Sequence, residues 1–280
     1  MHGTRIVHRA WLPDGPARGT VVLVHGINEH GGRYAHVAAH LVGHGWLAVA
    51  PDHRGHGLSG GRRAAVEHFG DWVLDLDTYV RMVLTDAPRP LFLLGHSLGG
   101  LIALVSALRN PDGKHGLILS SPSVMPAVTP GTGVERVARL LSRWVPNLPL
   151  IRLRLDAVSR DPVVVAAYRD DPLVHHGRVR VRTATEVLAA IAEVRRDIGT
   201  LRMPLLSLQG TRDLLVDPAA AAWVDRHAGS PDHALIVYDG LYHEVLNEPE
   251  RGAVLNDITA WLERHADAAA PLDTSAASRR

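Results

Sequence analysis

The chain has 280 residues, of which 46% are hydrophobic and 21% charged, a composition typical of a soluble globular protein. The formal net charge is +1 and cysteine is absent. These features exclude disulfide scaffolds, cysteine nucleophiles and cysteine metal sites, and they give no electrostatic reason to expect nucleic acid. No apolar stretch approaches the roughly 20 residues of a membrane-spanning helix, and the first residues have no signal-peptide core. We therefore expect a cytoplasmic protein, with peripheral contact to a membrane or cell envelope left open.

Short apolar runs alternate with helical patterns along most of the chain. The runs, each predicted to be a strand, are Arg5–Leu12, Thr20–Val24, Trp46–Ala50, Leu91–Leu94, Leu117–Leu119, Leu205–Leu208 and Ala234–Val237. The helical patterns are Val66–Leu84, Leu98–Leu108, Pro218–His227 and Pro249–Arg264. Continuous apolar runs fit strands that are buried on both faces, and their alternation with helices predicts a mostly parallel α/β sheet. The first run alternates and is expected at an edge.

One region, from about residue 122 to residue 199, breaks this alternation. It holds seven prolines and several amphipathic helical patterns, which predicts a mainly helical insertion between two late strands, where α/β folds place ligand-facing loops. We predict a core of residues 1–123 and 199–268 and a cap of residues 124–198. The tail, residues 269–280, carries little apolar surface to bury and is expected to be disordered.

The strongest chemical signal is a G-x-S-x-G pentapeptide at residues 95–99. It follows a strand run and opens a helical pattern, which is the context of a nucleophile elbow. Such a turn lifts the serine hydroxyl above the sheet, and glycines two residues away on each side avoid a clash. The alternative is a flexible turn with an incidental serine, which the flanking strand and helix disfavour. We predict Ser97 as a nucleophile.

A serine nucleophile needs a base that is held by an orienting acid. In hydrolases with this elbow, the acid and then a histidine follow later strands. Asp213 and His243 come shortly after two such runs, in that order, whereas most of the 18 histidines carry no positional signal. Asp217 is the main rival for the acid and Asp239 a weaker one, but Asp217 precedes a proline and fits a helix N-cap.

Acyl transfer also needs two backbone N–H groups aimed at the developing oxyanion. One donor comes from the residue after the nucleophile, here Leu98, and the other from the loop after an early strand. The segment His25-Gly26-Ile27-Asn28 follows such a strand, so we predict Ile27 as the second donor. Alone, this segment would be only a strand-ending turn.

Several longer motifs occur in one order and together resemble the monoacylglycerol lipase family of α/β-hydrolases. They are HGINEHGGRY (residues 25–34), PDHRGHGLSGGRR (51–63), GHSLGG (95–100), SRDPVVVAAYRDDPLV (159–174), LQGTRDLLVDP (208–218) and YDGLYHEVLNEPE (238–250). The likeness runs from about Ile6 to His265. The first motif and the D-P-L stretch are much more specific to this family than the elbow.

The resemblance implies an α/β-hydrolase fold with an eight-stranded sheet and a cap over an acyl tunnel. It implies the same nucleophile, acid, base and oxyanion donors as the spacing does. Glu29 and Arg33 then lie near the glycerol end, and Tyr168 matches the cap tyrosine of the family. Eukaryotic members carry a second histidine three residues after the catalytic one, where this chain has Leu246. We also expect His96, inside the elbow, to contact substrate.

An apolar stripe at helical spacing marks the cap, with arginines off the stripe. Its members are Val134, Val137, Ala138, Leu141, Trp144 and Val145. The stripe packs on the core or faces lipid, as basic amphipathic helices do. If the stripe faces lipid, Leu141 and Trp144 contact substrate or a lipid aggregate.

These features predict a serine ester hydrolase that converts monoacylglycerols to glycerol and fatty acid through an acyl-enzyme. The alternatives are a lysophospholipase or a broad carboxylesterase on the same triad, and a binding protein on an inactive hydrolase fold. Neither a metal nor a cofactor is expected, because the histidine pairs lack partners at ligand spacing. The expected partner is a small lipid substrate, with nucleic acid excluded and the oligomeric state open.

Overall fold

A seven-stranded sheet forms the centre of the protein in this computed structural model, which describes residues 3–127, 131–152 and 154–269. The strand order is β1-β3-β2-β4-β5-β8-β9, and only β1 runs antiparallel to its neighbour. The strands are β1 (His8–Trp11), β2 (Thr20–Val24), β3 (Leu47–Pro51), β4 (Leu91–His96), β5 (Gly116–Ser120), β8 (Leu205–Gly210) and β9 (His233–Tyr238). The mostly parallel sheet is thus confirmed.

The count of eight strands implied by the family resemblance is wrong for the described residues. The sequence holds seven apolar runs, and each supplies one strand, so no run remains to form an eighth. The first run is shorter than predicted because its beginning bonds to a loop: Gly60 N donates to the Arg5 carbonyl at 2.9 Å, and Asp52 N donates to the Val7 carbonyl at 2.8 Å.

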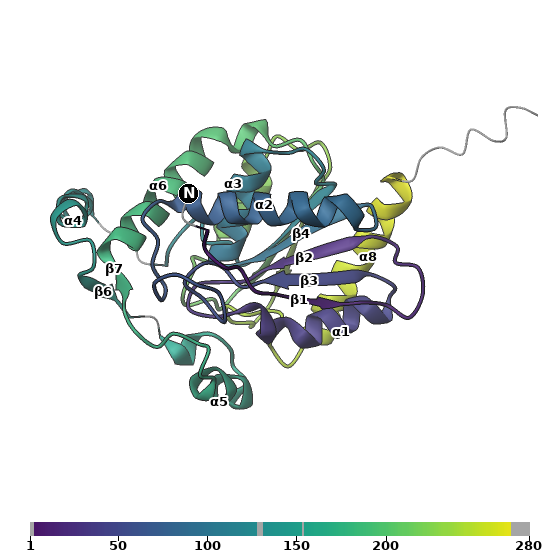
Figure 1. The fold of residues 1–280 in the computed structure, drawn as a ribbon, viewed down its shortest axis with the longest axis horizontal. Coiled ribbons are helices and arrows are strands. Elements are labelled where there is room, and N and C mark those ends of the chain that lie inside the picture. The colour runs from purple at the N-terminus through teal and green to yellow at the C-terminus, as the bar shows by residue number, and fades with distance from the viewer. Residues whose placement is uncertain (1–2, 128–130, 153, 270–280) are drawn as a thin grey trace, which may run out of the picture.

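Helices cover both faces of the sheet (Figure 1). One face carries α1 (Ala35–Gly43) and α8 (Arg251–Ala269), which bury residues such as Trp261. The other carries α2 (Phe69–Asp86), α3 (Leu98–Arg109), α6 (Val181–Asp197) and α7 (Ala220–His227). The sequence pattern missed α1, a nine-residue helix.

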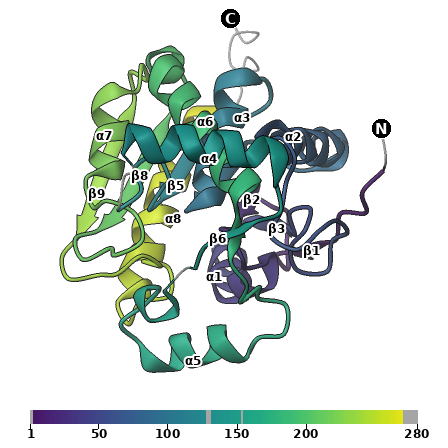
Figure 2. The same cartoon turned by 90° about the vertical axis from the view of Figure 1, so that its left-hand side faces the viewer.

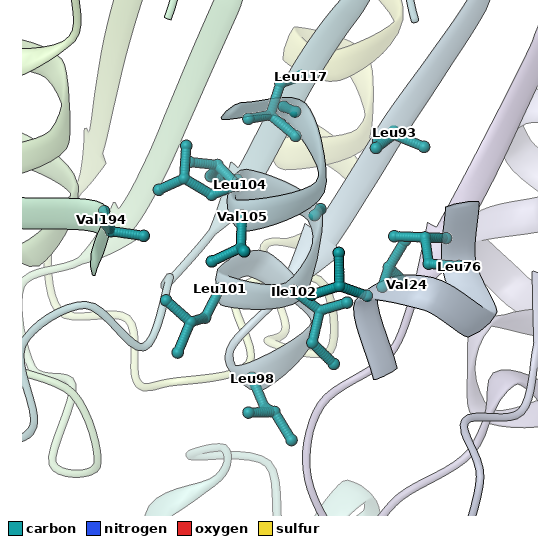
Figure 3. Packing of buried hydrophobic residues seen from close by; sticks show 14 of the residues in the cluster. Val24, Leu76, Leu93, Leu98, Leu101, Ile102, Leu104, Val105, Leu117 and Val194 are labelled. Atoms are coloured by element: carbon teal, nitrogen blue, oxygen red, sulfur yellow. The ribbon is translucent and has the colours of Figure 1, made fainter. Parts of the chain in front are cut away.

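The helix α3 lies at the centre of the larger core cluster. Figure 3 shows its apolar residues between strand residues, Leu76 of α2 and Val194 of α6. All but the last two of its twelve residues are buried. Burying a large aliphatic side chain is worth about 1.5–3 kcal/mol, so this packing fixes the helix whose first residue follows Ser97.

The segment between β5 and β8 forms a cap at one end of the sheet (Figures 1 and 2). It contains α4 (Thr132–Trp144), β6 (Pro149–Ile151), α5 (Pro162–Asp170), β7 (Val179–Arg180) and the long α6. The strands β6 and β7 pair antiparallel and are too short for a sequence pattern to reveal. The predicted tail lies, apart from Ala269 at the end of α8, outside the described residues. No helix in the described ranges has the length and apolar character needed to cross a membrane.

The only lysine of the chain, Lys114, is buried and contacts both α2 and the end of α3. Its ammonium group donates to Asp77 Oδ1 of α2 at 3.2 Å and to the carbonyl of Asn110, which caps the end of α3. Asp77 also accepts a hydrogen bond from Ser106 of α3 at 2.5 Å. A buried carboxylate with several donors is stable because its lost hydration is replaced.

Candidate active site

Ser97 occupies a strained turn between β4 and α3. Its backbone has φ 53° and ψ −119°, a left-handed conformation that non-glycine residues adopt rarely. A Cβ on Gly99 would lie 2.0 Å from the Val24 carbonyl oxygen, and one on Gly95 would lie 2.6 Å from the Gly99 carbonyl oxygen. The two glycines therefore let the turn close tightly, as an elbow requires.

Asp213 and His243 lie side by side, following β8 and β9. His243 Nδ1 is 2.7 Å from Asp213 Oδ2. The other carboxylate oxygen accepts the N–H groups of Leu215 and Val216 at 2.8 and 2.9 Å, and Gln209 donates its side-chain amide to Oδ2 at 2.9 Å. These donors hold the carboxylate in one orientation toward the imidazole.

The two rival acids have other partners. Asp217 Oδ1 accepts the backbone N–H of Ala219 at 2.9 Å, which forms a local turn just before α7. The N-cap of α7 is Ala219 rather than Asp217. Asp239 accepts a hydrogen bond from Thr211 at 3.0 Å. Of the three candidates, the one that contacts His243 is Asp213.

Burial and charge oppose each other at this pair. Burial alone would lower the pKa of His243, but the negative charge and hydrogen bond of Asp213 outweigh it, and the pKa lies above its ordinary value. Burial would raise the pKa of Asp213, yet the imidazole and the backbone donors bring it below its ordinary value. The aspartate is therefore ionised near neutral pH and stabilises a cationic imidazole.

Ser97 has a different hydrogen-bond partner from the one that the sequence suggested. Its Oγ lies 3.2 Å from Ser123 Oγ, whereas no hydrogen bond joins it to His243 among the described residues. The backbone N–H of Ser123 also donates to the Ser97 carbonyl at 3.1 Å. Ser97 and His243 nevertheless line one cavity, and catalytic hydrogen bonds are often long in unliganded structures.

Of the two predicted oxyanion donors, Ile27 lines this cavity and Leu98 lines the apolar cavity beside it. Leu98 is the first residue of α3, where N–H groups have no intrahelical acceptor. The N–H of Ile27 has no partner among the described residues, and the Ile27 side chain lines the cavity. The loop that contains Ile27 is anchored to the segment after β3, because His53 N donates to His25 Nε2 at 2.9 Å. Both donors are thus available near Ser97.

Glu29 and Arg33 belong to a buried ion cluster behind the cavity. Arg33 donates to Glu29 Oε2 at 2.5 Å and binds both oxygens of Glu244 at 2.7 and 2.8 Å. Glu29 Oε1 accepts the Gly26 N–H at 2.6 Å. Both oxygens of Glu29 are engaged within the protein, so this carboxylate fixes the loop before Ile27 as well as lining the cavity.

The carboxylates of Glu29 and Glu244 both contact the Arg33 cation, and their pKa values shift in opposite directions. Burial raises the pKa of Glu29. Burial acts the same way on Glu244, but the bidentate contact with Arg33 outweighs it and lowers that pKa. The Arg33 guanidinium also lies 4.4 Å from the ring centre of Tyr168 in α5. The cluster therefore connects the Ile27 loop, the His243 segment and the cap.

His96 lies against the ring of His243, with 4.8 Å between the ring centres. Burial, together with the charge of His243, lowers the pKa of His96 to about 3, so it is neutral at physiological pH. Its Nδ1 is 3.1 Å from Ser120 Oγ. Like Glu29 and Tyr168, it lines the cavity that holds Ser97.

A second, mainly apolar cavity adjoins the first. The two share Ile27, Ser123, Leu215 and Val216. The remaining walls of the second cavity come largely from the cap, as Ile151, Val179, Ala184, Val187, Leu188 and Ile191. An elongated apolar group can therefore extend from Ser97 under the cap.

The side chains of the predicted cap stripe differ in their exposure to solvent. Trp144 is 77% exposed and Val134 63%, whereas Leu141 is only half-buried. Leu140, outside the predicted stripe, is 61% exposed. Neither Leu141 nor Trp144 lines either of the two cavities.

Sequence reasoning missed three residues of the site. Ser123, Glu244 and Gln209 contact the predicted nucleophile, the Arg33 cluster and the predicted acid. Glu244 carried a signal, because it directly follows His243 inside a family motif.

Leu246 is buried in the core beneath α8. No group of three or more histidine and carboxylate side chains in the described part of the chain is arranged to hold a metal ion.

Comparison with known proteins gives consistent matches over nearly the whole chain. The sequence model of a family described as Serine aminopeptidase, S33 matches residues 15–250. A monoacylglycerol lipase of Mycolicibacterium smegmatis is 41% identical over 94% of each chain. The monoglyceride lipase of Rattus norvegicus is 36% identical over 93% of this chain and 87% of its own. The crystal structure of a Paleococcus ferrophilus monoacylglycerol lipase matches with a TM-score of 0.84 at 30% identity, over 93% of this chain and 99% of that chain.

Proposed function

The chain belongs to the monoacylglycerol lipase family of α/β-hydrolases, and from this premise we propose that it hydrolyses monoacylglycerols to glycerol and a fatty acid. The observation that carries the proposal is the cavity in which Ser97, His243 and the Ile27 loop meet, continued by an apolar cavity under the cap. The chemistry requires only an ester and water.

In the first step, Ser97 Oγ attacks the ester carbonyl carbon and its proton passes to His243 Nε2. Asp213 contacts the other ring nitrogen, which fixes the tautomer and stabilises the cation that forms. Because Ser97 begins bonded to Ser123, its hydroxyl must first turn toward His243.

The tetrahedral intermediate carries a negative charge on the former carbonyl oxygen. The N–H groups of Ile27 and Leu98 stabilise that charge, a contribution of about 2.7–4 kcal/mol for a single donor. Collapse expels glycerol, which takes the proton from His243. Water, deprotonated by the same imidazole, then attacks the acyl-enzyme, and the fatty acid leaves as Ser97 regains its proton.

The two ends of the substrate fit the two cavities. The acyl chain occupies the apolar cavity between the cap and Leu98. The glycerol end lies near Glu29, His96 and Tyr168, which line the polar cavity. Arg33 acts behind this wall, because it holds Glu29 and Glu244 rather than lining the cavity.

The outer side of the cap contacts lipid aggregates. Large apolar side chains are exposed along α4 and β6, namely Val134, Val137, Leu140, Trp144, Val145, Leu148, Leu150 and Ile151. Exposed apolar side chains that recur along one helix and the strand after it are typical of a lipid or protein contact. Trp144 and its neighbours therefore act in substrate delivery, while Leu141 supports the helix from its half-buried side.

A hydrolysis panel tests this function. Mono-, di- and triacylglycerols, lysophospholipids and p-nitrophenyl esters are compared over several chain lengths, with the Ser97→Ala chain as the blank. Monoacylglycerols should be hydrolysed fastest. Faster turnover of lysophospholipids would favour the lysophospholipase alternative, and rapid turnover of triacylglycerols would contradict the one-chain cavity.

A further inference from the structure

Arginines gather where the cap meets the core, around the exposed strand β6. We call this group the arginine edge, and its members are Arg62, Arg63, Arg178 and Arg180. Arg62 and Arg63 belong to the loop before α2, and Arg178 and Arg180 flank Val179 on β7. Three of the four side chains are exposed, and Arg180 is half-buried.

The edge is continuous because its members bond to the same few segments. Arg62 donates to the Asn147 side chain just before β6, and Arg178 donates to the Leu150 carbonyl within β6 at 3.4 Å. Arg180 donates to the Arg63 carbonyl at 2.5 Å. Arg62 and Arg178 therefore border β6 directly. Arg180 joins them to Arg63, whose own guanidinium group donates to the Gly57 carbonyl at 2.6 Å.

None of the four has a carboxylate within salt-bridge distance among the described residues. Their acceptors are neutral oxygens. Elsewhere in the described parts of the chain, the ion pairs with carboxylates include those of Arg9, Arg18, Arg33, Arg54, Arg109, Arg154, Arg160, Arg182 and Arg196. Burial and the charge of Arg62 lower the pKa of Arg180, as expected where like charges stand close without a counter-ion.

The neighbouring helix adds to this positive charge. Residues 132–152, which include α4 and β6, hold four arginines and one acidic residue. The same segment exposes the apolar side chains assigned above to lipid contact. An apolar strip with a basic border is the pattern that binds the interface of an anionic membrane.

The edge also stands beside the route to the active site. Val179 lines the apolar cavity, as does Ile151 of β6. Side chains alternate along a strand, so Arg178 and Arg180 point away from the cavity that their neighbour lines. A surface held by these arginines would therefore lie next to the cavity wall.

We propose that the arginine edge docks the cap on bilayers that contain anionic phospholipids, with the guanidinium groups on the headgroup phosphates and the α4 side chains in the interface. This inference rests on the lipid contact in the proposed function and adds a requirement for negative charge. Guanidinium suits this role because it binds phosphate oxygens through paired N–H donors.

Vesicle flotation of the full chain tests the proposal. The Ser97→Ala chain is mixed with phosphatidylcholine vesicles, with and without phosphatidylglycerol, and no monoacylglycerol is present. Binding should be tighter to the anionic vesicles, and the difference should shrink as salt rises, because salt screens exposed charges. Equal binding to both vesicles would overturn the proposal.

Substitutions then test whether the arginine edge causes the preference for anionic vesicles. Each arginine near an anionic surface contributes about fivefold in affinity. Changing Arg62, Arg178 and Arg180 to Gln should therefore weaken binding to anionic vesicles by up to about a hundredfold and leave binding to neutral vesicles unchanged. The matched control changes Arg81 and Arg226, exposed arginines on core helices, and should bind as the parent does.

The same three positions changed to Lys keep the charge and should retain most of the binding. A triple Gln variant that binds as the parent does would overturn the proposal, as would double-stranded DNA that binds as tightly as the anionic vesicles. In the active chain, the Gln substitutions should leave hydrolysis of a short soluble ester intact, which also verifies folding. Failure of the hydrolysis panel would reject the proposed substrate without changing these vesicle results.

Discussion

The core and the cap hold their parts of the cavity in different ways. In the core, Ser97 and Asp213 are fixed by backbone geometry and by buried donors. In the cap, α4 is joined to α6 by a single side-chain hydrogen bond among the described residues, which Thr185 Oγ1 of α6 donates to Ser142 Oγ of α4 at 3.0 Å, and α4 exposes Trp144. The proposed chemistry thus depends on positions that the core fixes, whereas the proposed lipid contact depends on side chains that α4 exposes. Substitutions in the two regions should have separable effects.

The largest expected effect comes from the core. Ser97→Ala should lower esterase kcat by about 10⁶, because loss of the nucleophile removes the covalent route. The substitution removes one hydroxyl group and should leave the melting temperature near that of the parent chain. Steady-state kinetics and labelling by a fluorophosphonate probe measure the effect. A chain that kept a few per cent of the parent activity, with contamination excluded, would show that another residue is the nucleophile.

The next effect separates two aspartates on the same loop. Asp213→Asn should lower kcat by roughly 10⁴, because the imidazole loses the group that orients it and stabilises its cation. Asp217→Asn is the matched control and should cost at most about 1 kcal/mol of stability through its one hydrogen bond to the Ala219 N–H. Kinetics and thermal unfolding of both variants are compared. The reverse order of damage would contradict the assigned acid.

A smaller effect is expected in the cap. Leu140→Ser with Trp144→Ser should reduce activity on long-chain monoacylglycerol in micelles about 10- to 100-fold, because the two side chains, partly inserted in lipid, together contribute about 1.5–3 kcal/mol, the value for full burial of one large apolar side chain. Activity on a short soluble ester should be spared. The control is Leu74→Ser with Met82→Ser, which are exposed on α2. Equal loss on both substrates, with a lower melting temperature, would mean that α4 packs on the core instead.

The smallest expected effect is a shift in the pH dependence of kcat/KM, which should distinguish core substitutions from cap substitutions. Only a neutral His243 accepts the serine proton, and its pKa lies above the ordinary 6.5. The kcat/KM should therefore fall about tenfold per pH unit below that raised pKa. Asp213→Asn should move this acid limb to lower pH, since the main stabilising charge is lost. The cap variants should leave the limb in place, and a shift caused by them would link the two regions.

The strained turn at Ser97 and the contact between Asp213 and His243 could be predicted because their requirements are local. A positive φ at Ser97 demands small neighbours, and Gly95 and Gly99 record that demand in the sequence. Asp213 and His243 follow strand runs, and parallel strands end at one edge of the sheet. The positions of these groups were therefore encoded within a few residues of each of them.

Other features depend on contacts between distant segments and left no local pattern. Arg33 binds Glu244, 211 positions away, and Ser123 reaches Ser97 only through the pairing of β4 with β5. The cap stripe was predicted around Leu141, yet Leu140 is the more exposed, because a helical pattern gives the period of a helix but not its rotation against α6.

The burial of Lys114 has a consequence for covalent modification. With its ammonium bonded to Asp77, the described residues present no exposed side-chain amine. Acylating reagents modify lysine and leave guanidinium groups charged, because arginine does not lose its proton under such conditions. Acetylation therefore cannot neutralise the arginine edge, and the strength of its proposed contact with a membrane would vary with the lipid composition and the salt concentration.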